Sequence, residues 1–127
     1  MSLARGELDE AERLLQEALT NQKSLYIEVY VMAEIGLADI ARRKGRYDEA
    51  YSLLQRMLSF CGQHSLLQSY GSTSLALAEL SLQTGKVAGI MGLLQTVSRL
   101  LARAGYAHMQ MRCDKLLTKM AVASRFI

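Results

Sequence analysis

Apolar residues recur at steps of three and four along most of the chain, which is the spacing of one buried stripe on a helix. Leu8, Ala11, Leu15, Ala18 and Leu19 give the first example. This period differs from the alternation of a strand and predicts amphipathic helices. We expect six of them, at about 7–22, 25–44, 47–62, 65–84, 87–104 and 106–124. The short connections make neighbouring helices antiparallel.

Glycines and carboxylates mark the expected helix ends. Gly45 stands between two apolar blocks and supplies a helix stop. Asp48 and Glu49 then fall in the first turn of the next helix, where the exposed amides and the helix dipole favour negative charge. Ser24 and Ser65 are the residue type that caps helix N-termini, so we predict that they are N-caps.

The chain repeats itself at a step of about 40 residues. The segment GELDEAERLLQEAL at 6–19 recurs as GRYDEAYSLLQRML at 45–58, with 8 of 14 positions identical, and more weakly as GKVAGIMGLLQTVS at 85–98. In the same way IGLADIARRKG at 35–45 aligns with LALAELSLQTG at 75–85. Each period therefore holds two helices, an A helix followed by a B helix. A fixed period of this length indicates stacked structural units.

This pattern resembles the tetratricopeptide repeat. That motif places a small residue in helix A, a glycine at the turn, an aromatic residue or leucine two positions later and an alanine three positions after that, where this chain has Ala38, Gly45, Tyr47 and Ala50. The resemblance covers nearly the whole chain and implies an all-α fold, an α-solenoid of antiparallel helix pairs in a single domain, 1–127. HEAT and armadillo repeats share a similar period but do not predict this signature.

Two departures from the motif concern its length. The usual repeat is about 34 residues long, shorter than the step seen here. It also commonly ends in proline, which this chain lacks altogether. We therefore expect longer helices, as in the long repeats of MalT-type bacterial activators, the kinesin light chain and large assembly subunits.

The resemblance implies a binding surface on the concave side of the stack, where the A helices lie. Transferring the family's inward-facing positions gives the expected contact residues: Met32, Ile35, Asp39, Arg42 and Arg43 in the second helix, Ser72, Leu75, Glu79 and Gln83 in the fourth, and Arg112, Lys115 and Lys119 in the last. Tyr30 and Tyr70 are one period apart, and either line the same groove or pack the repeats together.

Charge is unevenly divided along the chain. Residues 1–79 hold 8 basic and 11 acidic side chains, whereas residues 80–127 hold 7 basic and 1 acidic. The three cations of the last helix are spaced as neighbours on one face. They would suit an acidic peptide or a C-terminal carboxylate, or they are the solvated face of a terminal helix. Both interpretations remain open at this point.

Other functional classes lack their motifs. The chain has no phosphate-binding loop, dinucleotide fingerprint, HExxH zinc motif, EF-hand or nucleophile elbow, so we expect no enzyme and no cofactor or metal. Cys61 and Cys113 belong to no paired motif and should be buried thiols. The basic C-terminal third lacks interleaved aromatics or a helix-turn-helix signature, so we do not expect nucleic-acid binding. No segment is long and apolar enough for a membrane span, and we expect a cytoplasmic protein.

We expect a protein-protein interaction or scaffold module that holds a peptide or partner helix in the A-helix groove. Alternatives are a sensor segment of a larger MalT-like transcription activator, or an oligomerisation and assembly segment. Because the chain opens on a B helix and closes on an A helix, we expect it to belong to a longer array. Leu8, Leu15 and Leu19 would then lack a covering A helix. The complementary charge of the two halves suggests a homo-oligomer.

Overall fold

The computed structural model describes residues 5–20, 27–87 and 89–124, and these residues form six α-helices without a strand. The predicted all-α fold is confirmed, and the predicted bounds agree with the observed ones to within three residues. The helices are α1 (Arg5–Thr20), α2 (Ile27–Arg43), α3 (Tyr47–Gln63), α4 (Leu67–Thr84), α5 (Ile90–Ala104) and α6 (Ala107–Ser124). None of the helices in these ranges is both long and apolar enough to cross a membrane.

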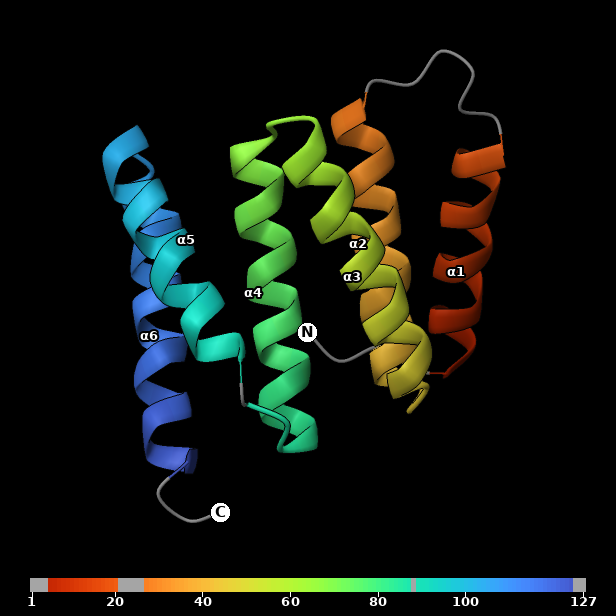
Figure 1. Cartoon of the computed structure of the whole chain (residues 1–127). Helices are drawn as coiled ribbons and strands as arrows, with labels where there is room; N and C mark the ends of the chain where they lie inside the picture. Colours follow the sequence, from red (N-terminus) through yellow and green to blue (C-terminus); the bar gives the residue numbers. More distant parts are fainter. Residues whose placement is uncertain (1–4, 21–26, 88, 125–127) are drawn as a thin grey trace.

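The helices form an α-solenoid of antiparallel pairs. Each helix packs against the next, and α4 also contacts both α2 and α6. Figure 1 shows α3 in front of α2 and α5 in front of α6, so that the A helices α2, α4 and α6 follow one another behind the B helices. This is the arrangement of tetratricopeptide-like helix pairs.

The C-terminal ends of α2, α3, α4 and α5 share one turn, which recurs every twenty residues. Gly45, Ser65, Gly85 and Gly105 all have positive φ, at 81°, 55°, 77° and 85°. The next residue along donates its backbone N–H to a carbonyl in the last turn of the helix, over 2.8–2.9 Å in each case, which is the long hydrogen bond of a Schellman motif. The four donor and acceptor pairs are Arg46 and Ala41, Leu66 and Cys61, Lys86 and Ser81, and Tyr106 and Leu101.

The N-cap prediction for Ser65 is wrong for the same reason. Ser65 closes α3 in the left-handed conformation, and the N-cap of α4 is Leu66, whose side chain makes no capping hydrogen bond. Ser65 therefore occupies the position that glycine holds in the other three turns. Ser24 lies outside the described residues.

Helix α5 begins at Ile90, three residues later than predicted. The aligned helix α3 starts at Tyr47 and carries Asp48 and Glu49 in its first turn, whereas α5 has no acidic residue there. Gly89 stands where α3 has Glu49, and it takes a left-handed conformation with φ 83°. Glycine is a poor helix former, so the loss of this first turn is expected.

The core is continuous from one helix to the next through α4. One cluster joins α4 to α5 and α6, with Leu75, Leu94 and Leu101 among its buried residues. A second cluster joins α4 to α2 and α3 through residues such as Leu54 and Leu80. Cys61 and Cys113 are free and buried, as predicted, and burial raises the pKa of both thiols.

Helix α1 is held on α2 by apolar and ionic contacts. Leu8 is buried, and Leu15 packs on Gly36, where an added Cβ would lie 2.9 Å from the Leu15 Cδ1 atom. Lys44 forms ion pairs with Asp9 and with Glu12, the latter over 2.8 Å. The expectation that Leu8 and Leu15 would be uncovered is therefore wrong, because α2 covers them. The side chain of Leu19 lies outside the described part.

Candidate protein-binding surface

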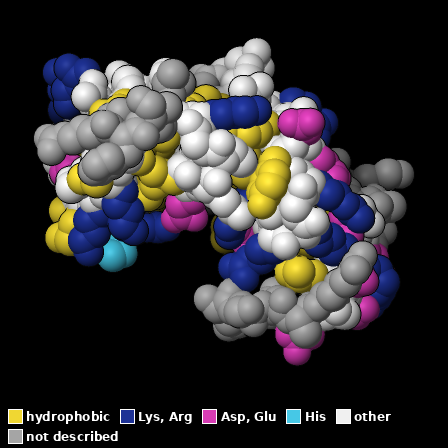
Figure 2. Space-filling model, turned by 90° about the horizontal axis from the view of Figure 1, so that it is seen from below, with side chains coloured by type: hydrophobic (Ala, Val, Ile, Leu, Met, Phe, Trp, Pro, Cys, Tyr) yellow, Lys and Arg dark blue, Asp and Glu magenta, His cyan; other side chains and the backbone are white. Residues whose placement is uncertain are grey.

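The candidate surface is the side of the molecule formed by the A helices α2, α4 and α6. Because α4 contacts both α2 and α6, equivalent residues of the three helices lie in rows across the array, forty residues apart. Seen along the helix axes, the molecule is indented on one side between two lobes, and Lys and Arg side chains stand on both flanks of the indentation (Figure 2). The surface is thus recessed and basic.

Two complete rows of predicted contact residues cross this surface. Met32, Ser72 and Arg112 make up the first row, and Asp39, Glu79 and Lys119 make up the second. Met32 is 70% exposed, the largest exposed fraction among the large hydrophobic side chains of the described residues. Arg112, Glu79 and Lys119 are exposed, whereas Ser72 and Asp39 are half-buried. Both rows therefore end in a cation on α6, whereas on α2 the first row begins with an apolar side chain and the second with a carboxylate.

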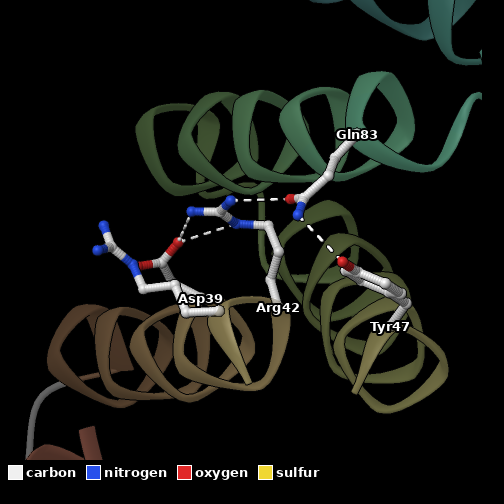
Figure 3. A network of polar contacts seen from close by, with 5 residues as sticks. Asp39, Arg42, Tyr47 and Gln83 are labelled. Carbon is white, nitrogen blue, oxygen red and sulfur yellow. Dashed lines mark hydrogen bonds and ion pairs between the residues drawn. The ribbon is translucent and has the colours of Figure 1, made fainter. Parts of the chain in front are cut away.

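A polar network joins α2 to α4 and α3 at one end of the surface (Figure 3). Asp39 accepts hydrogen bonds from Arg42 through Nη2 at 2.7 Å and from Arg43 through Nε at 2.9 Å. Arg42 also donates from Nη1 to Gln83 Oε1 at 2.9 Å, and Gln83 Nε2 donates to the Tyr47 hydroxyl at 3.1 Å. Three predicted contact residues of α2 and one of α4 thus meet in one network.

The carboxylate of Asp39 is held in its charged form. Partial burial favours its neutral form, but the hydrogen bonds and positive charge of Arg42 and Arg43 outweigh this and hold the pKa of Asp39 below its usual value. The two guanidinium groups of α2 are therefore already paired with an anion of their own chain. Their attraction for an anionic partner is correspondingly reduced.

The cations of α6 are differently placed. Arg112, Lys115 and Lys119 are exposed, and none of them forms an ion pair within the described residues. The acidic residue of this helix, Asp114, accepts a hydrogen bond from Ser98 Oγ of α5 at 2.8 Å. The strongest unbalanced positive charge of the A-helix layer therefore lies on α6.

The structure corrects the assignment of Leu75. Its side chain is only 2% exposed and packs in the cluster between α4, α5 and α6, so it is not available to a partner. Ile35, one period earlier, is half-buried against the neighbouring clusters. Lys115 is the third residue of this row and is exposed. Ile35 and Leu75 thus lie on the side of their A helix on which the following helix pair packs, and Lys115 lies on the equivalent side of α6.

Tyr30 and Tyr70 do come together, but against α3. Both pack on the cluster that contains Met57 and Cys61, and the Tyr30 ring lies 5.5 Å from that of Phe60. The Tyr70 ring also lies beside Gly62 of α3, at an ordinary van der Waals distance of 3.7 Å from the position of an added Cβ. Of the two interpretations open for these tyrosines, the structure supports repeat packing.

Tyr47 is the contact that sequence reasoning missed. It was assigned to the turn motif alone, yet its hydroxyl reaches Gln83 at the edge of the surface. The forty-residue step carried a signal, because Val87 follows Gly85 as Tyr47 follows Gly45, and a phenol in place of an aliphatic side chain adds a hydrogen-bonding group. Within the described part of the chain, no group of three His, Cys, Asp or Glu residues could hold a metal ion.

Comparison with protein families gives one finding. Neither the curated proteins nor the solved structures contain a match to this chain. The family model that matches is that of the tetratricopeptide repeat, and the match spans residues 35–62, from the middle of α2 to the end of α3. This match and the six-helix solenoid support a tetratricopeptide-like repeat, an architecture typical of protein-protein interaction modules.

Proposed function

We propose that the chain binds an acidic peptide segment of a partner protein across the A-helix surface. The observation that carries this proposal is the contrast between the two ends of the surface. On α2, Arg42 and Arg43 are neutralised in part by Asp39. On α6, Arg112 and Lys119 are exposed and form no ion pair with another described residue. Carboxylates of a partner would therefore be bound at α6.

The opposite end of the surface favours an apolar contact. Met32 is flexible and polarisable, and methionine of this kind adapts its shape to different apolar partners. Glu79 of α4 lies between the two ends and is exposed. It would disfavour a carboxylate at the centre of the bound segment. The proposed ligand thus has an apolar residue for Met32 and acidic residues, or its terminal carboxylate, for α6.

The test uses synthetic acidic peptides with free or amidated C-termini and measures their binding by isothermal titration calorimetry. The variant Arg112→Glu with Lys119→Glu reverses both cations of α6. Its matched control is Arg99→Glu with Arg103→Glu, which makes the same change of net charge on exposed residues of the B helix α5. Circular dichroism establishes that all three proteins are helical.

We expect the α6 variant to lose at least about tenfold in affinity, since two charge-assisted contacts are replaced by repulsion. The α5 control should bind as the wild type does, apart from a small long-range effect that disappears as salt is raised. Equal loss in both variants would mean that net charge alone attracts the peptides and would rule out the α6 site. A loss confined to peptides with a free C-terminus would identify the C-terminal carboxylate as the group recognised.

A further inference from the structure

One face of α6 is unpartnered within the described residues. The residues of this face form a stripe and are aligned, at steps of forty, with buried or half-buried residues of α4 and α2. Those of α4 pack against α5 and α6, and those of α2 pack against α3 and α4. On α6 the same stripe is open, and Met111 and Val122 are 54% and 51% exposed. The stripes are Val31, Ile35, Ala38 and Arg42 on α2, Gly71, Leu75, Ala78 and Leu82 on α4, and Met111, Lys115, Thr118 and Val122 on α6.

One face of α1, around Leu14, also lacks a packing partner among the described residues. Leu14 aligns with Leu53 of α3 in the repeat, and Leu53 packs against a cluster of buried residues from α2, α3 and α4. Leu14 is instead 52% exposed, because α1 turns Leu8 and Leu15 toward α2 and has no A helix on its other side in the described chain. Glu10 and Glu17 are four and three residues away from Leu14 and lie on the same face.

We propose that α1 of a second copy packs on this open face of α6, so that copies stack head to tail. An A helix of this fold is followed by a B helix, and α1 is a B helix whose A-helix side is open. The pairing would bring Leu14 between Met111 and Val122 and would set Glu10 and Glu17 beside Lys115. This contact rests on Met111, Lys115 and Val122, whereas the proposed peptide site on α6 rests on Arg112 and Lys119.

Charge favours a contact between α6 and α1 of a second copy over a contact between two identical helices. Helix α1 contains five acidic and two basic residues, whereas α6 contains three basic and one acidic. A symmetric contact between two α6 helices would oppose Lys115 to itself, and one between two α1 helices would oppose Glu10 and Glu17 to their copies. The ion pairs of Arg13 with Glu10 and Glu17 are solvent-exposed, so they compete only weakly with a new partner.

The test is sedimentation velocity of two single variants, alone and mixed. Leu14→Lys repels Lys115 but keeps α6 intact, whereas Met111→Glu repels Glu10 and Glu17 but keeps α1 intact. Both substitutions place opposite charges four residues apart in their own helix, which favours helix formation and keeps the fold. Circular dichroism and a thermal melt verify this.

We expect the wild type to exceed its 14.1 kDa monomer mass as concentration rises, and each variant alone to remain a monomer. The equimolar mixture should associate, because α6 of Leu14→Lys and α1 of Met111→Glu are both unchanged. Salt should weaken both associations. A wild type that is monomeric at every concentration overturns the proposal. So does a single variant that still associates, or a mixture of monomeric variants that does not.

Discussion

Ser65 adopts the left-handed backbone conformation that glycine adopts in the three equivalent turns. Four turns place a residue in the left-handed conformation, and three of the four residues are glycine. A side chain in this region meets the following carbonyl oxygen and costs about 1–2 kcal/mol. Ser65 is exposed and lies in the same hydrogen-bonded turn as the glycines, so its hydroxyl side chain brings this cost without a visible compensating contact.

We therefore predict that Ser65→Gly stabilises the protein. Relief of the steric cost exceeds the extra backbone entropy of glycine, which leaves a net gain of about 0.5–1 kcal/mol. Chemical denaturation followed by circular dichroism measures it. The reverse change, Gly85→Ala, is the control: an added Cβ meets nothing within 4 Å, so its expected loss of about 1 kcal/mol would come from the backbone alone. A destabilised Ser65→Gly protein would contradict this account.

The sequence predicts the exposure and role of single residues less well than it predicts the helices. The repeat correctly aligned Ile35, Leu75 and Lys115, but it gave all three the same role. Their exposure differs because α4 has neighbours on both sides whereas α6 has none beyond it in the described chain. The sequence likewise does not predict the network of Asp39, Arg42 and Gln83, because this network depends on how closely α2 and α4 approach each other.

Helix α1 shows what can be predicted of an element and what cannot. Its existence, its apolar stripe and its place as a B helix all followed from the forty-residue period. The means by which it is attached did not, because Lys44 is a long way from Asp9 and Glu12 in the sequence and has no counterpart in the motif. Hydrogen bonds to Asp9 and Glu12 raise the pKa of Lys44, so the ammonium group keeps its charge to more alkaline pH than an isolated lysine does.

We predict that Lys44→Met loosens α1 selectively. Methionine retains much of the apolar stem but removes the ammonium group, leaving Asp9 and Glu12 without their shared cation. Amide hydrogen exchange should show about a tenfold loss of protection in α1 and little change in α3 and α4. Arg13→Met is the matched control, because the ion pairs of Arg13 join residues of α1 only. Equal deprotection of α1 by both variants would refute a docking role for Lys44.

At the scale of the whole molecule, the core is continuous, but α4 contributes to two clusters of buried residues. Leu94 and Leu80 are both fully buried, but Leu94 belongs to the cluster of α4, α5 and α6 and Leu80 to that of α2, α3 and α4. Contacts run mainly between neighbouring helices. Stability in such arrays is approximately a sum of local terms, so damage on one side need not spread to the other.

Truncation of these two leucines tests that division. Leu94→Ala and Leu80→Ala should each cost about 2–5 kcal/mol. In native-state hydrogen exchange, Leu94→Ala should deprotect α5 and α6 more than α2 and α3, and Leu80→Ala should show the opposite order. If both variants instead lower protection equally in every helix, the array unfolds as one cooperative unit and α4 is no boundary.

The recurrence of one turn after each of the helices α2 to α5 affects how the chain can change in length. Since the turns that follow the A helices α2 and α4 have the same left-handed glycine and the same hydrogen bond, residues 45–84 form an interchangeable cassette that begins and ends at equivalent points. An in-frame duplication of that cassette would insert another helix pair without requiring a new junction. The array can therefore be lengthened or shortened in steps of one helix pair, and each added pair would widen the A-helix surface between α2 and α6.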